Sequence, residues 1–343
     1  MLTSLNDSMT DDWWVFMLAA FAHAPDFDDP LAALTVGERP TPAAREGWKE
    51  LSVAAASLNM HDVWTLKGVG IAPELFPMIL GMDASGHLSD GTPAVVYPVL
   101  NEADWRGDET LDPRRTLLTE QVQGTLAERV ALPAANLVPI PPGITLEDAA
   151  VLGTAWLTAY RMLFTKARLR PGQAMLVQGA SGGVSTALIQ LGRAAGFRVW
   201  ATGRTSAKRA FAEEMGAHGV FEPGVRLPER VHAVFESVGE ATWGHSMRSL
   251  RPGGALICCG ATTGINPGAD LARLISLQIR VEGSTMGTRE EFIDLLAFVS
   301  THGIRPHIGM KVPLSEARSG FATMIAGEAR GKILVDIDGA APN

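Results

Sequence analysis

The chain has 343 residues, 46% of them hydrophobic, so it is long enough for two domains with sizeable cores. Its formal net charge of -8 disfavours a surface for nucleic acid or for an anionic membrane. The two cysteines, Cys258 and Cys259, are neighbours that point to opposite faces of a strand, so no disulfide framework is expected and the cytoplasm is the expected compartment. The apolar run 13–22 is too short to span a membrane.

The first part of the chain has the pattern of short, interrupted strands that is typical of a β-rich domain. Short apolar runs at 15–21, 48–56, 94–99 and 127–131 are interrupted by Pro, Gly and Asp. The polar and charged stretch 100–126 is expected to be a long surface loop, and 137–143 a proline-rich crossing. Thr145 is a candidate N-cap for a helix that runs through 148–150, and a further helix is expected around 155–166.

Residues 174–286 alternate between strands and helices. Strands are expected at 175–178, 198–202, 231–236, 254–260 and 279–284, and helices at 182–195, 206–215, 241–249 and 270–277. This alternation predicts an α/β unit with a parallel sheet covered on both faces. Helices at 288–300 and 315–326 follow, and the last strand, 332–337, is expected to return to the first domain.

A glycine turn joins the first strand of this unit to its first helix. It reads Gly179-Ala180-Ser181-Gly182-Gly183-Val184-Ser185, with Ser181 in place of the second glycine of G-x-G-x-x-G and no glycine at the third position. Glycines let the backbone approach a pyrophosphate, and the helix N-terminus offers free N–H groups. The turn therefore predicts a dinucleotide site; the alternative is a tight strand-to-helix turn without a ligand.

Several further motifs carry a family resemblance. They are Ala55-Ala-Ser-Leu-Asn59-Met-His-Asp62, Leu80-Gly-Met-Asp83-Ala-Ser-Gly86, Thr154-Ala-Trp-Leu-Thr158-Ala-Tyr160, Leu250-Arg-Pro-Gly-Gly254, Gly260-Ala-Thr-Thr-Gly264, Gly283-Ser-Thr-Met-Gly287 and Gly331-Lys332. With the glycine turn, they resemble the medium-chain dehydrogenase/reductase superfamily, and most of all its zinc-free, quinone-oxidoreductase-like branch.

The resemblance implies a two-domain oxidoreductase. Residues 1–144 would form a GroES-like β-rich catalytic domain, 145–287 a Rossmann domain with a doubly wound parallel sheet, and 288–343 a return to the catalytic domain. The active site would lie in the cleft between them, with hydride transferred from a nicotinamide. The residues implied in cofactor binding are Thr158, Gly179, Ala180, Ser181, Gly182, Gly183, Val184, Gly203, Arg204, Lys208, Val238, Gly260, Ala261, Ser284, Met286 and Lys332.

A catalytic zinc is not expected. The positions that match the zinc ligands of relatives hold Asn59, Met82 and Thr154, and a carboxamide, a thioether and a hydroxyl are poor ligands for Zn²⁺. Asp83 is a single carboxylate and does not make a site. The segment 100–126 resembles the lobe that holds a structural zinc in many relatives, but it contains no cysteine.

The second strand of the nucleotide unit predicts NADPH as the cofactor. NAD sites place an acid at the end of this strand to bind the ribose 2′-hydroxyl. Here Gly203 stands there, followed by Arg204 and Lys208, which can bind a 2′-phosphate. The alternative is that these cations form an ordinary solvated helix start.

The candidate catalytic residues are Asn59, His61, Asp83 and Thr154. Asn59 could orient the substrate or polarise its carbonyl, and His61 matches the position of a proton-relay hydroxyl in many zinc-dependent relatives. Each has an alternative: His61 as a packing or surface histidine, Asn59 as a residue that satisfies loop backbone, and Thr154 with Thr158 as helix N-terminal hydrogen-bonding residues.

The resulting prediction is an NADPH-dependent enzyme that delivers hydride to a quinone or to the β-carbon of an α,β-unsaturated carbonyl. An enoyl-thioester reductase and an NADPH-binding redox sensor with little turnover are the alternatives. The expected partners are a small carbonyl or quinone substrate and a second copy of the chain. The two copies would pair through the edge strand at 280–284, because unpaired edge strands can join across a twofold axis.

Overall fold

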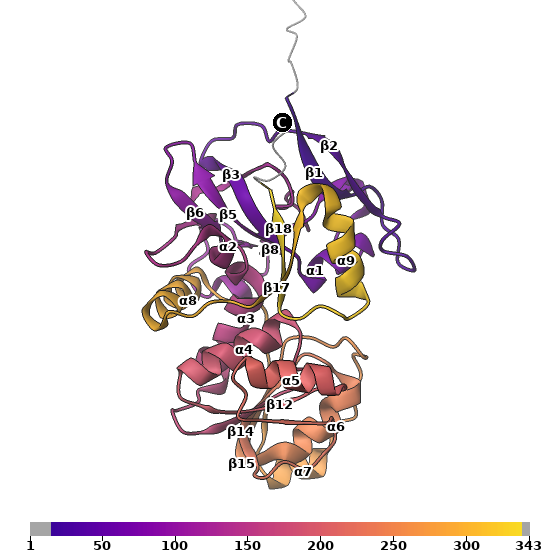
Figure 1. Cartoon of the computed structure of the whole chain (residues 1–343), viewed down its shortest axis with the longest axis vertical. Helices are drawn as coiled ribbons and strands as arrows, with labels where there is room; N and C mark the ends of the chain where they lie inside the picture. The colour runs from indigo at the N-terminus through magenta and orange to yellow at the C-terminus, as the bar shows by residue number, and fades with distance from the viewer. Residues whose placement is uncertain (1–14, 338–343) are drawn as a thin grey trace, which may run out of the picture.

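The computed structural model describes residues 15–337, so the first 14 residues of the predicted catalytic domain and residues 338–343 of the predicted return lie outside it. A β-rich part, built from both ends of the chain, lies above a parallel-sheet part, and the helix α3 (Leu157–Tyr160) lies between them (Figure 1). No helix within residues 15–337 is long and apolar enough to cross a membrane.

The β-rich part contains three sheets. The largest has seven strands in the order β10-β6-β5-β3-β18-β17, with β9 paired to β3. Its strands are β3 (Trp48–Ser57), β5 (Asp83–Leu88), β6 (Pro93–Val96), β9 (Arg129–Pro133), β10 (Leu137–Pro139), β17 (Ile308–Pro313) and β18 (Lys332–Asp336). The smaller sheets contain β1 (Phe16–Ala22), β2 (Leu34–Pro40) and β4 (Met78–Ile79), and β7 (Val99–Leu100) with β8 (Thr116–Leu117).

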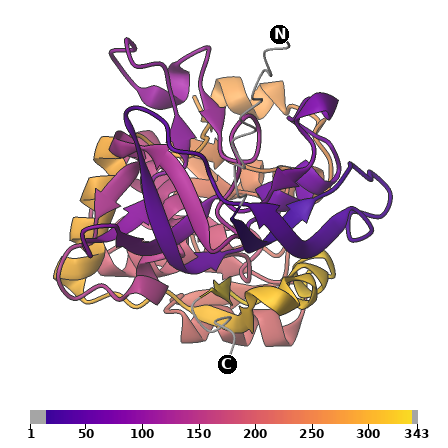
Figure 2. The ribbon, with the colours of Figure 1, turned by 90° about the horizontal axis from the view of Figure 1, so that it is seen from above.

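The last strand returns to the first sheet. β18 pairs antiparallel with β3 and parallel with β17, so the final strand of the chain fills the middle of the sheet rather than its edge. Figure 2 shows α8 (Arg289–His302) and α9 (Ala317–Ile325) on different sides of these strands. The short helices of this part are α1 (Met60–Leu66), α2 (Leu146–Ala149), η1 (Pro73–Leu75), η2 (Glu109–Leu111), η3 (Ala134–Asn136) and η6 (Leu314–Glu316).

The second part has a six-stranded sheet in the order β13-β12-β11-β14-β15-β16, and every pairing in it is parallel. Numbered within the unit, this is the order 3-2-1-4-5-6 of a Rossmann fold. Its strands are β11 (Ala174–Val177), β12 (Arg198–Thr202), β13 (Gly219–Phe221), β14 (Val231–Glu236), β15 (Leu250–Cys258) and β16 (Arg280–Gly283). Its helices are α4 (Gly183–Ala194), α5 (Ser206–Glu214), α6 (Glu240–Ser249) and α7 (Leu271–Ser276). The predicted α/β fold is therefore confirmed.

Alternating side chains of β11 pack into two different hydrophobic cores. Met175 and Val177 belong to the large core shared with α4, whereas Ala174 and Leu176 belong to a smaller core that contains Met247 of α6. Because successive side chains of a strand point to opposite faces, a fully apolar strand requires cover on both sides. The apolar run that predicted a buried strand thus also explains the helices on both faces.

A continuous helical segment links the two parts. It runs through η4 (Leu152–Trp156), α3 and η5 (Arg161–Ala167), and η4 and η5 have the wider π-helical turn. Irregular turns of this kind often occur at functional sites. The segment carries Thr154 and Thr158 at one end and Arg161 and Lys166 at the other.

Two expectations about the first domain are only partly correct. Segment 100–126 is not only a surface loop: it contains η2 and β8 and buries Leu118, Leu126 and Thr119. The crossing at 137–143 begins with strand β10, which pairs antiparallel with β6 at the end of the large sheet. Both segments gain their order from partners that are distant in the chain, which local composition does not report.

The edge strand β16 is compatible with the predicted homodimer, which stays a prediction. Its outer edge has no partner among the described residues, and Val281 on it is 41% exposed. Leu271 and Ile275 of the preceding α7 are 62% and 71% exposed. We expect light scattering at micromolar concentration to give the mass of a dimer, and Val281→Asp to shift it towards the monomer. A wild-type monomer would count against pairing at this edge.

Candidate active site

Four of the predicted site residues meet in one buried network beside the linking helix. Asp83, which is 1% exposed, lies at its centre. Its Oδ1 accepts a hydrogen bond of 2.5 Å from Thr154 Oγ1. Its Oδ2 accepts hydrogen bonds from Ser57 Oγ at 2.9 Å, Asn59 Nδ2 at 2.9 Å and Lys332 Nζ at 3.0 Å. The network therefore joins β3, β5, β18 and η4 at one point.

The ammonium of Lys332 is fully engaged in this network. Besides Asp83, it donates to Asn59 Oδ1 at 2.6 Å and to the carbonyl of Leu58 at 2.9 Å. An ammonium has three N–H donors, and all three are used. The side chain is 3% exposed, so the pair with Asp83 is a buried salt bridge whose polar groups are satisfied.

The start of α1 is fixed by a second buried acid. Asp62 accepts hydrogen bonds from the backbone N–H groups of Asn59 and Gly81, both at 2.8 Å. Burial raises the pKa of Asp62 to about 7, against the effect of these two N–H groups. Met82 is fully buried in the hydrophobic core. Asp62 thus positions Asn59 and the adjoining turn, and Met82 is a packing residue.

His61 lies outside the Asp83–Lys332 network. Its Nε2 is buried without a hydrogen-bond partner and lies 4.0 Å from Glu120 Oε1. Burial lowers its pKa, opposed by Glu120 and by a hydrogen bond with the backbone of Leu118. Glu120 is held through its other oxygen by Leu117 N at 2.8 Å and Thr116 Oγ1 at 3.2 Å. A cavity of 670 Å³, lined in part by Gly70 and Ile71, adjoins Glu120.

The two tyrosines are placed away from any proton-donating role. Tyr97 is 2% exposed, its hydroxyl donates to the carbonyl of Gly287 at 2.9 Å, and burial raises its pKa. Tyr160 packs against Phe164 and Phe298, and burial raises its pKa as well. Tyr97 thus holds Gly287 and the α8 residue Phe292 against the β-rich part, and Tyr160 holds Phe298 of α8 against the linking helix.

The glycine turn has the geometry that a dinucleotide needs. Gly179 has φ of +74°, and a side chain there would also meet Val238 Cγ2 at 2.9 Å from the Cβ position. Around Gly182 a Cβ would meet no atom within 4 Å, so the first turn of α4 is open to a ligand. Helix N-termini of this length present free N–H groups and a positive dipole end. The residues present therefore fit a pyrophosphate.

The C-terminal segment closes one side of this turn. Gly331 N donates to Ser181 O at 2.9 Å, and a Cβ on Gly183 would lie 3.1 Å from Lys332 Cδ. The other predicted contacts follow the carboxyl ends of β14, β15 and β16, where open α/β sheets bind ligands. They are Val238, whose N–H donates to Glu236 Oε1, Gly260 and Ala261 after β15, and Ser284 and Met286 after β16. Thr158 is 7% exposed on α3.

Three cations gather where the second strand ends. Arg204 and Lys208 were predicted there, and Arg330 from the C-terminal segment joins them. Burial and then the charges of Arg204 and Arg330 lower the pKa of Lys208, whose Nζ donates to the carbonyl of Gly327 at 2.9 Å. Three like charges in one place repel each other, so an anion bound among them would be stabilised.

The residues of this site do not fit a zinc ion. Within residues 15–337 no group of three or more His, Cys, Asp or Glu side chains could hold a metal. Asn59 and Thr154 already hydrogen-bond to Asp83, and the ammonium of Lys332 would repel a divalent cation. We expect mass-spectrometric metal analysis of the isolated protein to find well under one zinc per chain. About one zinc per chain, with activity lost to a chelator, would refute this prediction.

A Rossmann sheet with a turn that fits a dinucleotide, linked by a helical segment to a β-rich part that holds a buried polar network, is the architecture of oxidoreductases that use a nicotinamide cofactor. A model of the family described as zinc-binding dehydrogenase matches residues 183–301. The chain belongs to the medium-chain dehydrogenase/reductase superfamily.

Individual relatives agree with this assignment. A quinone oxidoreductase of Mus musculus is 26% identical over 83% of this chain and 88% of its own length. A crotonyl-CoA carboxylase/reductase of Cereibacter sphaeroides is 29% identical over 75% of this chain and 72% of its own. The crystal structure of an NAD-dependent alcohol dehydrogenase matches with a TM-score of 0.86 and 29% identity, covering 94% of this chain and 100% of that one.

Proposed function

We propose that this protein is an NADPH-dependent oxidoreductase that reduces a quinone or an α,β-unsaturated carbonyl without zinc. The cluster of Arg204, Lys208 and Arg330 beside Gly203 is the observation that carries the proposal. These cations favour a 2′-phosphate, whereas an NAD site needs an acid at the position of Gly203. The nicotinamide, when bound, supplies the hydride.

The Asp83–Lys332 network favours this substrate class. Its charges cancel within the pair, and the donors of Lys332 and the amide of Asn59 point at protein acceptors. The network therefore offers no Lewis acid and no free donor to polarise a simple ketone or alcohol. Quinones and enones accept hydride with less activation, because the negative charge spreads through conjugation. In this proposal Asn59, Asp83 and Thr154 position the cleft rather than touch the reacting atoms.

Parallel assays of cofactor oxidation test the proposal. Purified protein is mixed with NADPH or NADH and with matched panels of quinones, enones, saturated ketones and primary alcohols. We expect steady NADPH oxidation with members of the first two panels and slower reaction with NADH. Turnover of alcohols or saturated ketones alone would contradict the proposed substrate class, and NADPH binding without any turnover would favour a redox sensor.

A second candidate is an enoyl-thioester reductase. It is favoured by the similarity to a crotonyl-CoA carboxylase/reductase, 29% identical over 75% of this chain. The same hydride addition to a β-carbon would serve a thioester. Crotonyl-CoA belongs in the assay panel, and a kcat/KM far above that of any simple enone would favour this candidate.

His61→Gln is expected to lower enone turnover more than it raises KM. Hydride addition to an enone leaves an enolate, and protonated His61 can supply the proton. Because burial lowers the pKa of His61, its acidic form is lost as pH rises through a value below the ordinary 6.5. The wild-type enone rate should therefore fall with rising pH in that range, and the variant should lose this dependence. A quinone takes its protons from water and should be affected less.

His87→Gln provides a control for this experiment. His87 is an exposed histidine on β5 in the same domain, so its replacement should leave both profiles unchanged. Unchanged enone kinetics in folded His61→Gln would make water the proton source.

A further inference from the structure

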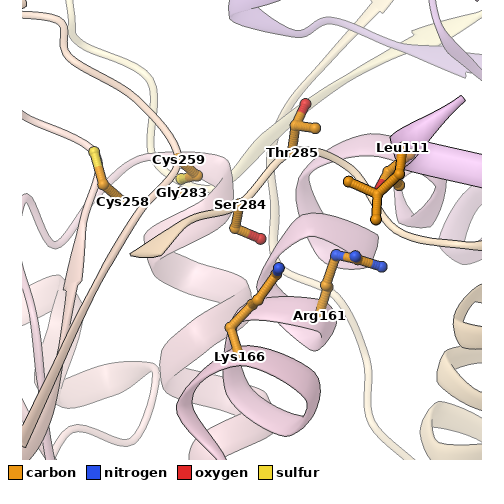
Figure 3. Close-up of a pocket in the computed structure, with 9 residues that line it drawn as sticks. Leu111, Arg161, Lys166, Cys258, Cys259, Gly283, Ser284 and Thr285 are labelled. Carbon is orange, nitrogen blue, oxygen red and sulfur yellow. The ribbon is translucent and has the colours of Figure 1, made fainter. Parts of the chain in front are cut away.

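A second cavity lies where the nucleotide domain meets η2, and the proposed function does not account for it. It has a volume of 310 Å³. Since liquid water occupies about 30 Å³ per molecule, this space exceeds what one or two waters need. Its lining side chains include Arg161 and Lys166 of the linking helix and Ser284 and Thr285 after β16 (Figure 3). Cys258 and Cys259 lie at its other side.

The cavity is lined by hydrogen-bond donors that have no acceptor. Ser284 Oγ and Arg161 Nε are buried without a partner, in side chains that are 9% and 3% exposed. Lys166 is half-buried and forms no hydrogen bond or ion pair with any residue between 15 and 337. Figure 3 shows the ammonium of Lys166 and the hydroxyl of Ser284 pointing towards one another across the space. A buried polar group without a partner costs free energy, so a ligand that accepts hydrogen bonds from these donors would be stabilised here.

The acids near the cavity are already committed. Asp108 and Glu291 both pair with the guanidinium of Arg161, the latter at 2.7 Å. Glu291 also accepts from Thr288 N, and Asp108 from Thr110 N. None of the nine lining residues is Asp or Glu. The two carboxylates lie on the guanidinium of Arg161 and do not line the cavity, so the charged group of the lining that has no partner in the described part of the chain is the ammonium of Lys166.

The thiols on the far wall do not change this conclusion. Burial raises the pKa of Cys258 and raises that of Cys259 to about 12, so both are neutral near pH 7. A neutral thiol is a weak donor and supplies no negative charge. The ligand that fits this lining is a small anion that accepts several hydrogen bonds.

We propose that this cavity binds a carboxylate or phosphate group through Lys166 and Ser284, with Arg161 as a third donor. Ser284 is also a predicted contact of the cofactor, so the anion would lie close to the bound cofactor. Two sources supply such a group: the acidic end of the substrate, or a free anion that acts as an effector. The substrate source rests on the proposed function; the binding site itself does not.

A pair of ligands that differ in one charge tests the site. The probes are 4-oxo-2-pentenoate, an enone with a carboxylate, and its uncharged methyl ester, with inorganic phosphate and acetate as free anions. Binding to the full-length protein with NADP⁺ is measured by calorimetry, and turnover with NADPH is measured separately. The variants are Lys166→Met, the conservative Lys166→Arg, and Lys49→Met, which removes the charge of an exposed lysine at the start of β3 in the other domain.

We expect wild type to bind the acid more tightly than the ester. Lys166→Met should weaken binding of the acid by about tenfold to a hundredfold, as expected for loss of a charge-assisted hydrogen bond, and should leave binding of the ester unchanged. Lys166→Arg should restore much of the affinity, and Lys49→Met should match wild type. Phosphate or acetate binding that Lys166→Met abolishes, without preference for acid over ester, would identify the free-anion source.

Equal affinity for acid and ester in wild type, together with no binding of phosphate or acetate that depends on Lys166, would overturn the site. Because calorimetry needs no turnover, this result is distinct from failure of the proposed reaction. Absence of NADPH oxidation with either enone would count against the enzyme function while leaving the binding result to decide the cavity.

Discussion

Lys332→Met is expected to lower the free energy of unfolding by about 3–5 kcal/mol, the usual cost of breaking a buried ion pair by removing one partner. The substitution leaves Asp83, which is 1% exposed, as an uncompensated buried carboxylate. It also removes the donor that Asn59 Oδ1 and the Leu58 carbonyl share. Urea denaturation followed by tryptophan fluorescence measures the change.

Lys311→Met serves as a matched control. Lys311 is on the neighbouring strand β17 and pairs with Glu147 and Asp336, but it is 45% exposed. Exposed pairs contribute roughly 0–1 kcal/mol, so this variant should remain close to wild type. The double variant Lys332→Met with Asp83→Asn should recover part of the loss, because no buried charge remains. Similar stability of Lys332→Met and Lys311→Met would show that the pair does not hold the site together.

Arg204→Ala should weaken NADPH binding about tenfold to a hundredfold, since a bidentate charged contact contributes roughly 1.5–3 kcal/mol. Binding of NADH should be nearly unchanged. The reason is the missing acid at Gly203 and the gathering of Arg204, Lys208 and Arg330. Arg330→Ala should act in the same direction. Fluorescence titration of both cofactors measures the effect.

The control for Arg204→Ala is Arg198→Ala, at the start of β12, the strand that ends just before Arg204. Arg198 pairs with Glu229 on the surface, so its loss should leave both cofactors unchanged. Equal weakening of NADPH and NADH by Arg204→Ala would refute the assignment of the 2′-phosphate contact.

The nucleotide domain was the more predictable half of the chain. Its strands are continuous apolar runs, and its helices end at glycines such as Gly196 and Gly216, so local pattern and tertiary structure agree. The first domain was harder. Strand β5 contains Asp83 and Gly86, and strands of two residues such as β4 owe their order to partners far along the chain. Strand β13 was also missed, because three residues carry too little periodicity.

The site was partly predictable for the same reason. Asn59, Asp83, Thr154 and Lys332 lie in four separate motifs, and matched positions were enough to single them out. Ser57, Glu120 and Arg330 were missed, because each acts through a contact that only the folded chain creates. A cue existed for Arg330, which stands two residues before Lys332 in the segment that faces the glycine turn.

The position of β18 determines the order in which the two parts of the chain can fold during synthesis. The nucleotide sheet is formed by one continuous stretch of chain, so it can fold while the ribosome is still adding residues. The large sheet of the first domain cannot close until residues 332–336 emerge, because they fill the place between β3 and β17. Until then residues 55–57 of β3 present an unpaired edge, which is prone to join another nascent chain. The ammonium that neutralises Asp83 arrives in this same strand, so the buried Asp83–Lys332 network forms only after residues 332–336 have been added.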